Sequence, residues 1–217
     1  PSSEHTPAVL RLLARHRIKA TFFVIGRYLD GKSKRAHRNR DVLRRVAAAG
    51  HLVGNHTHDH ALLTSATRAD VLAQIDDGAA SIERVLGKRP VLFRPPYGGL
   101  DEFGQSAVRE RGLDLILWSV EKQDMQRDDA HETFREIVAQ LDYKEGGVVL
   151  LHDVRKSSVE VLEKLLDYLD GHRFDPRHPT RMGYEVVDLP TYLRAVAADP
   201  LPYATRDELE RARLNRR

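Results

Sequence analysis

Short apolar runs alternate with longer amphipathic stretches along the chain, as in proteins built from buried strands and covering helices. Each short run ends within a few residues at a glycine or a polar turn, which is the length of a strand rather than of a helix. The runs are Ala20–Ile25, His51–Asn55, Val91–Phe93, Leu113–Val120, Gly147–Leu151 and Tyr184–Leu189. We predict a strand at each of them, with Ala20–Ile25 buried on both faces.

Apolar residues at spacings of three and four predict a helix between successive strands. The clearest helix follows Thr67, which is expected to cap it with Asp70 three residues on, and it ends at Gly87. A first helix runs to about His16, with Thr6 as its cap and Pro7 in its first turn. The other helices are expected at Asp41–Ala49, Phe103–Arg111, Asp129–Leu141 and Ser157–Leu169, and from Thr191 onward.

This alternation predicts an α/β fold with a parallel sheet and helices packed outside it. The sheet could be open and doubly wound, or it could be a closed or nearly closed barrel. In both architectures the functional residues gather where the strands end. Polar residues that directly follow the predicted strands are therefore the candidates for function.

The composition of the chain excludes some classes of protein and restricts which atoms could bind a metal. The 217 residues include 41% hydrophobic and 31% charged residues, which is typical of a folded globular protein, and no apolar run approaches the ~20 residues of a membrane-spanning helix. The net charge of +3 does not by itself indicate a nucleic-acid partner. Because the chain has no cysteine, any metal must be held by nitrogen and oxygen, which directs attention to its 11 histidines.

A basic stretch from Lys32 to Arg40, with Arg44 and Arg45 after it, has two interpretations. It could bind nucleic acid or another anionic polymer, or it could be the solvated face of a helix. The stretch has no interleaved aromatic residues for base stacking, so we favour the solvated face and expect no nucleic-acid partner.

Two histidines follow the predicted strand at His51–Asn55. His56 and His60 are four residues apart, so on one helical turn both imidazoles would lie on the same side, whereas His58 would point elsewhere. Imidazole is a favoured zinc ligand, so the pair predicts a divalent metal site. The alternative is a pair of surface or capping histidines, and the other histidines, His16 among them, are expected at the surface.

Further polar residues follow three other strands: Arg94 in the Arg94-Pro-Pro-Tyr-Gly98 segment, then Asp124, and finally His152 with Asp153. Any one of them could be only a cap or a loop contact. Taken together with the histidine pair, they match the parts of a metal site with an acid and an orienting charge.

Five segments occur in order: Thr6-Pro7, Ala20–Val24, Asn55–His60, Arg94–Gly98 and Leu150–His152. This series resembles the polysaccharide deacetylase family, carbohydrate esterase family four. The resemblance implies a distorted, incomplete (β/α) barrel with a catalytic domain over residues 1–198, followed by a basic tail at 199–217. It also implies hydrolysis of N-acetyl groups on peptidoglycan or chitin, or of O-acetyl groups on xylan, with a bound divalent metal. Zinc is the expected metal, with cobalt or nickel as alternatives.

The resemblance also assigns roles to the metal-binding half of the site. It implies that His56 and His60 are metal ligands and that Thr57 buttresses them. Arg94 would orient the catalytic base, and the turn at Tyr97 would offer a backbone N–H to the oxyanion.

In the other half, His152 would be the general acid, and Asp124 would pair with it. Leu150 would line the acetyl pocket, and Trp118, which could equally be a core residue, would contact substrate. Many members have a tryptophan where this chain has Met125, which softens that wall of the cleft.

The family's opening motif, Thr-Phe-Asp-Asp-Gly, supplies the catalytic base and a third metal ligand. In the family it stands just before a Pro-Ser segment such as Pro1-Ser2, so we expect it upstream of this chain. Neither Asp59 nor Asp153 occupies a position that would replace it.

The expected function is therefore metal-dependent deacetylation of an acetylated polysaccharide or oligosaccharide. The alternative is a glycan-binding pseudoenzyme of the same fold. We expect a monomer that acts in the cell envelope or outside the cell, because polymeric substrates lie there.

Overall fold

The computed structural model describes residues 2–122, 124–125, 129–178, 181 and 183–198, and these residues form two compact units. The sheet unit comprises residues 2–3 and 21–117, and the helical unit comprises residues 4–20 and the described residues from 118 onward. The predicted tail at 199–217 lies outside the described residues. None of the helices in the described ranges is long and apolar enough to cross a membrane.

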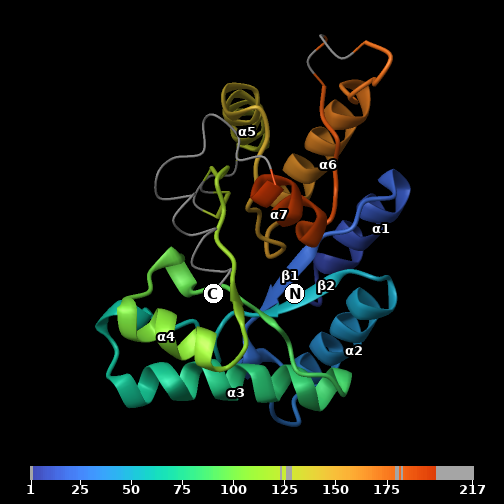
Figure 1. Cartoon of the computed structure of the whole chain (residues 1–217). Coiled ribbons are helices and arrows are strands. Elements are labelled where there is room, and N and C mark those ends of the chain that lie inside the picture. Colours follow the sequence, from blue (N-terminus) through green and yellow to red (C-terminus); the bar gives the residue numbers. More distant parts are fainter. Residues whose placement is uncertain (1, 123, 126–128, 179–180, 182, 199–217) are drawn as a thin grey trace. The chain divides into compact units, whose positions relative to one another are not determined.

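The sheet unit contains a four-stranded parallel sheet in the order β1-β2-β3-β4. The strands are β1 (Thr21–Val24), β2 (Leu52–Asn55), β3 (Leu92–Phe93) and β4 (Asp114–Leu115). The connecting helices are α2 (Lys34–Ala48), α3 (Arg68–Leu86) and α4 (Glu102–Glu110), and α2 and α3 lie beside β2 (Figure 1). An open parallel sheet with covering helices confirms the predicted α/β class and fits an incomplete barrel.

Apolar side chains from the helices and strands close the core of the sheet unit. Phe93 of β3 is fully buried together with Ile75 of α3 and Val108 of α4, and Val24 of β1 packs in a second cluster with Leu43 of α2. Burial of one such side chain contributes roughly 1.5–3 kcal/mol. The ends of β1, β2 and β3 are thereby fixed by packing.

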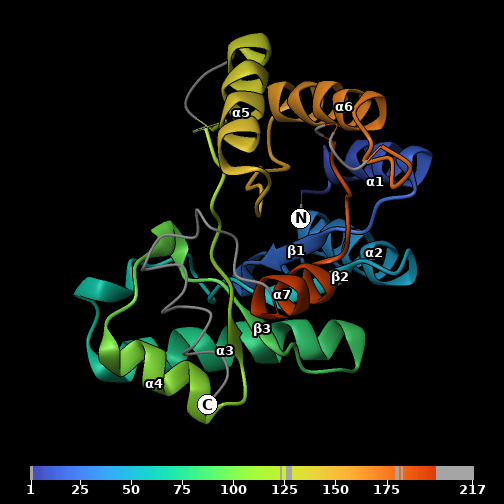
Figure 2. The ribbon, with the colours of Figure 1, turned by 45° about the horizontal axis from the view of Figure 1, so that its top comes forward.

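The helical unit contains α1 (Thr6–His16), α5 (Ala130–Lys144), α6 (Lys156–Gly171) and α7 (Leu189–Ala198). Helix α6 packs against both α1 and α5 (Figure 2), over a core that includes Val120, Ile137 and Val161.

The two predicted strands at 147–151 and 184–189 are reduced in the structure to single parallel bridges, Val120 with Val149 and Arg173 with Tyr184. Two consecutive glycines explain the first case. Gly146 and Gly147 have φ of 133° and 141°, so the backbone enters this run in a conformation that other residues rarely adopt.

Several helix ends differ from the sequence prediction. Helix α2 begins at Lys34 rather than at Asp41, because the Ser33 hydroxyl accepts a hydrogen bond from Ala36 N at 3.0 Å and caps it there. Thr6 is the first residue of α1 rather than its cap, and its hydroxyl donates to Asp153 instead. The predicted cap at Thr67 is confirmed, since its hydroxyl accepts from Asp70 N at 3.2 Å.

The expectation that His16 lies at the surface was wrong. Its side chain is only 5% exposed, and Nδ1 lies 2.5 Å from Asp170 Oδ2 across the contact between α1 and α6. A buried imidazole needs such a partner, because an unpaired polar group inside a protein costs stability.

Candidate active site

Residues 56–60, which we call the histidine loop, continue directly from β2. Backbone hydrogen bonds join the loop to the chain around the end of β1: His56 N donates to Val24 O at 2.9 Å, and Gly26 N donates to Thr57 O at 3.0 Å. Thr57 and His60 have φ of 66° and 63°, which is the left-handed region. The predicted helical turn is therefore absent, and the loop is shaped by two left-handed residues instead.

The loop nevertheless brings His56 and His60 together, as predicted. Their ring centroids lie 4.9 Å apart, edge to face. His56 Nδ1 lies 2.6 Å from the carbonyl oxygen of Arg94, and because a carbonyl can only accept, Nδ1 carries a proton, which leaves the lone pair of the neutral ring on Nε2. Metal-binding histidines characteristically donate their other ring N–H to such a carbonyl, so this donor fits a divalent ion.

Thr57 supports His60, the second member of the candidate ligand pair. It is fully buried, and its hydroxyl accepts a hydrogen bond from His60 N at 3.0 Å. This is the kind of buttress that the resemblance implies for this residue.

Nearby carboxylates do not complete a ligand set. Within the described ranges no group of three or more His, Asp or Glu side chains is placed to hold a metal ion. Asp59 bonds to Gln74 Nε2 at 2.9 Å, and Asp153 accepts from Thr6. Both aspartates thus contact other side chains, and the expectation that neither replaces the family's opening motif stays a prediction.

Arg94 follows β3 and is held from several sides. It is 7% exposed, its Nε donates to Ile116 O at 3.2 Å, and its Nη2 donates to Leu117 O at 3.1 Å. The guanidinium also lies 4.2 Å from the centre of the Phe23 ring. Burial lowers the pKa of Arg94 to about 10, so the group is still a cation at neutral pH. A fixed, largely desolvated positive charge of this kind can orient a carboxylate.

The turn after Arg94 exposes Tyr97. Tyr97 has a left-handed φ of 59° and is 69% exposed, and its ring centroid lies 5.0 Å from that of His60. In the sheet unit, the structure thus brings together four predicted site residues: His56, His60, Arg94 and Tyr97.

The other predicted site residues belong to the helical unit. His152 donates to Asp124 twice, from its backbone N at 2.8 Å and from its ring Nδ1 at 2.6 Å. Asp124 is 2% exposed and the His152 side chain is 40% exposed, so the pair has a buried acceptor and an accessible ring. Leu150 is half-buried and donates its N–H to Val120 O at 2.9 Å, and Trp118 is half-buried. The predicted pairing of Asp124 with His152 is therefore present, and the catalytic roles of these residues stay predictions.

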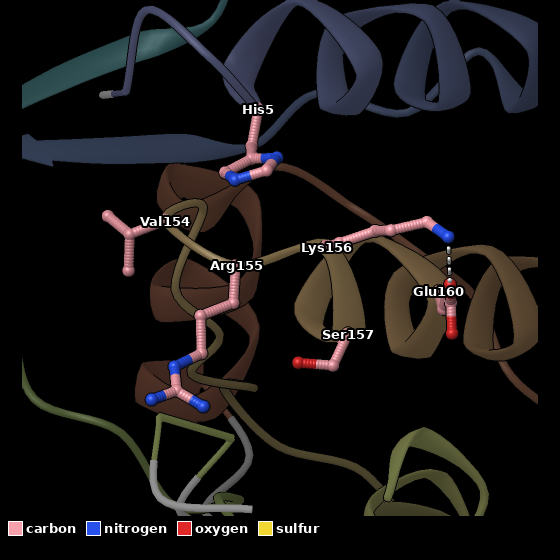
Figure 3. A pocket seen from close by; sticks show the side chains of 6 residues that line it. All are labelled: His5, Val154, Arg155, Lys156, Ser157 and Glu160. Atoms are coloured by element: carbon pink, nitrogen blue, oxygen red, sulfur yellow. Dashed lines mark ion pairs between the residues drawn. The ribbon is translucent and has the colours of Figure 1, made fainter. Parts of the chain in front are cut away.

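A separate hollow in the helical unit adjoins the start of α6. Figure 3 shows side chains from the segment after Asp153 and from the start of α1 around it, with Lys156 and Glu160 3.5 Å apart in an ion pair. The lining residues are His5, Val154, Arg155, Lys156, Ser157 and Glu160. None of them was predicted as a site residue, because no motif marks them.

Sequence reasoning also missed the partners of His58. As predicted, His58 points elsewhere than its two neighbouring histidines, and it contacts Asp30 and Asp59. Only the position of His58 between two candidate ligands hinted at a role, and the contact with Asp30 spans 28 residues.

The chain is similar to several known proteins. A family model described as polysaccharide deacetylase matches residues 1–116. The peptidoglycan-N-acetylglucosamine deacetylase PgdA of Listeria monocytogenes is 33% identical over 175 residues, which cover 81% of this chain and 35% of that protein. The chain thus matches only about a third of that relative's length.

Two further relatives match over more of their own length. A peptidoglycan-N-acetylglucosamine deacetylase of Bacillus cereus is 34% identical over 181 residues, covering 80% of each chain. The solved structure of the peptidoglycan deacetylase PdaC from Bacillus subtilis superposes with a TM-score of 0.68 at 27% identity, covering 91% of this chain and 90% of that one.

Proposed function

The chain belongs to the polysaccharide deacetylase family, and we propose that the protein removes acetyl groups from N-acetylated polysaccharide. The observation that carries the proposal is the facing pair His56 and His60, with the buried Arg94 bonded to His56 through its carbonyl. We propose peptidoglycan as the substrate ahead of chitin and O-acetylated xylan, because relatives from Listeria and Bacillus are named for peptidoglycan.

The metal proposed for this reaction would be held by Nε2 of His56 and by the imidazole of His60. We propose zinc, with cobalt or nickel as alternatives, because imidazole favours these ions. The bound ion would supply Lewis-acid polarisation of the acetyl oxygen.

The remaining residues would act on the substrate directly. His152 would protonate the leaving amine, and Asp124 would hold its ring in place and stabilise its charged form. Tyr97 would offer its backbone N–H to the oxyanion, while Leu150 and Trp118 would contact the acetyl group and the sugar. Arg94 would orient the carboxylate that serves as the base.

An acetylated glycan is the proposed partner, and nucleic acid is not. The proposed site of action is the cell envelope or the outside of the cell, where peptidoglycan is accessible, and the proposed state is a monomer.

Acetate release from N-acetylated chitooligosaccharides and from peptidoglycan, with zinc or cobalt added, tests the function. This chain would be compared with the same chain extended at its N-terminus by a segment that carries Thr-Phe-Asp-Asp-Gly. We expect acetate from the extended chain, and a matched extension with both aspartates changed to asparagine serves as the control. Absence of acetate from every glycan with every metal would overturn the proposal.

A second candidate is a glycan-binding protein without turnover. It is favoured by one observation: the described residues place two histidines at the site and no third metal ligand. Saccharide binding by both chains without acetate release from either would support it.

A further inference from the structure

His58 occupies the middle of the histidine loop and turns away from both candidate ligands. Its side chain is 25% exposed and lies between two carboxylates, with Nε2 2.9 Å from Asp30 Oδ2 and Nδ1 3.2 Å from Asp59 Oδ1. Both ring nitrogens are thus within donating distance of an acceptor-only group. A side chain held at both ends can fix the backbone that carries it.

The carboxylate of Asp30 is itself anchored to α3. Ser81 Oγ donates to Asp30 Oδ2 at 3.0 Å, and Arg84 Nη2 donates to Asp30 Oδ1 at 2.6 Å. Partial burial acts to raise the pKa of Asp30, but the hydrogen bonds from His58, Arg84 and Ser81 together outweigh it and hold the pKa below its usual value.

Asp59 is anchored to the same helix at a different point. Gln74 Nε2 donates to Asp59 Oδ2 at 2.9 Å, and the backbone N of Asp59 donates to Gln74 Oε1 at 2.8 Å. His58 therefore connects two carboxylates that are each fixed to α3, and the loop is tied to one rigid element at two places.

The backbone of the loop also lies directly against α3 and the end of β1. A Cβ added at Gly78 of α3 would come within 2.7 Å of the Thr57 carbonyl carbon, and a Cβ at Gly26 would lie 3.0 Å from His58 Cδ2. Side chains at these glycines would push the loop out of place. Because the backbone of the loop lies so close to α3, the polar contacts of His58 hold the loop directly against this helix.

The loop needs such a frame because its conformation is unfavourable in isolation. Thr57 and His60 both adopt left-handed backbone angles, which are strained for residues other than glycine. Without external contacts the loop would relax toward other conformations, and the rings of His56 and His60 would separate.

We propose that His58 is a positioning residue, whose bridge between Asp30 and Asp59 preorganises the histidine loop so that His56 and His60 face one metal ion. The inference rests on the proposed function only for the identity of the ligands, because the bridge itself is formed by residues of this chain. Preorganisation means that the cost of ordering the loop is met on folding and not on metal binding.

The test compares the full chain with His58→Ala and with the conservative variant His58→Gln, which keeps an N–H donor directed at Asp30. The exposed His37 on α2 provides the matched control, His37→Gln. The dissociation constant for Co²⁺ and for Zn²⁺ is measured by competition with a chromophoric chelator. We expect about tenfold weaker binding for His58→Ala, partial recovery for His58→Gln, and no change for the control.

A second readout needs no metal. The His60 amide, which donates to Thr57 Oγ1, is followed by hydrogen exchange in the metal-free chain. We expect about tenfold faster exchange in His58→Ala, with unchanged exchange in β1. If His58→Ala does not fold, as judged by circular dichroism, Asp30→Asn is measured in its place.

Unchanged metal affinity together with unchanged exchange of the His60 amide would overturn the inference. If the parent chain binds no metal measurably, the exchange result alone decides. Weaker metal binding in His58→Ala with no acetate release from any form would contradict the proposed function and leave the positioning role supported.

Discussion

The histidine loop and the Asp124–His152 pair hold their side chains in different ways. In the loop, backbone bonds to β1 and contacts with α3 fix the chain, and His56 and His60 are carried on it. In the pair, the two residues bond to each other, and the backbone beneath them makes one isolated bridge rather than a regular strand.

This difference shows where each of the two groups of residues is vulnerable. A loop that is fixed by its backbone keeps its shape when a single ligand side chain is removed. A pair that is fixed by its own hydrogen bonds loses its geometry when either member is changed, because the partner is left without its main contact.

The largest effect is expected when a candidate metal ligand of the histidine loop is removed. His60→Ala removes one of two facing imidazoles, so metal affinity, and acetate release by the extended chain, should both fall by more than a hundredfold. This exceeds the ~10–100-fold loss expected when a contact outside the metal ligands is removed. The melting temperature of the metal-free chain should fall by less in His60→Ala than in the variant Gly78→Ala. Chelator competition and an acetate assay measure the first effect, with the exposed His178→Ala as control. Full metal affinity in His60→Ala would remove it from the ligand set.

The second effect tests the acid pair. Asp124→Asn removes the negative charge that accepts both bonds from His152, so acetate release should fall about a hundredfold, within the range for a positioned general acid. Metal affinity should stay within about twofold of the parent, since the histidine loop is fixed by other residues. An equal loss of metal affinity would show that Asp124 also affects the histidine loop.

The third effect concerns the packing beneath the loop. Gly78→Ala places a Cβ 2.4 Å from Asn55 Oδ1, so the free energy of unfolding should fall by about 2 kcal/mol even though alanine is the better helix former. Gly171→Ala, at the end of α6 with open space around it, is the matched control and should be neutral or slightly stabilising. Urea denaturation measures both. Equal stability of the two variants would mean that α3 can shift without cost.

The smallest effect is pH-dependent and concerns the surface of the sheet unit. Hydrogen bonds from Arg111, with Nε 2.8 Å from Asp76 Oδ1, hold the pKa of Asp76 below its usual value. A lowered pKa in the folded state stabilises the fold above the unfolded pKa near 3.8, and this gain is lost as the pH falls through the folded value.

Asp76→Asn should therefore cost about 0.5 kcal/mol at pH 7, the size expected of a solvent-screened pair, and less at pH 2, which is below the unfolded pKa. Urea denaturation at both pH values measures it, with the exposed neighbour Asp77→Asn as control. A cost that persists at low pH would point to packing rather than to charge.

The sequence predicted the elements whose signals are local. Helix α3 was recognisable from its apolar spacing, the cap at Thr67 and Gly87, which has a left-handed φ of 69°. The start of α2 was missed because Lys34–Arg40 is so rich in charge that its two inward positions, Ala36 and Asn39, do not stand out.

The members of the candidate site were named from the sequence, whereas their geometry was predicted less well. His56 and His60 do face each other, yet the reason was wrong, because left-handed angles at threonine and histidine leave no mark in a sequence as a glycine would. The burial of His16 was missed because its partner, Asp170, lies 154 positions away. Contacts of that range depend on packing, which local patterns do not encode.

Trp118 gives the chain a built-in optical probe. It is the only tryptophan in the sequence, it is half-buried, and it belongs to the helical unit. Its emission therefore reports the melting of that unit without background from the other, whereas the ellipticity of the helices averages over both. Unfolding curves recorded by the two signals will coincide only if both units come apart in a single cooperative step.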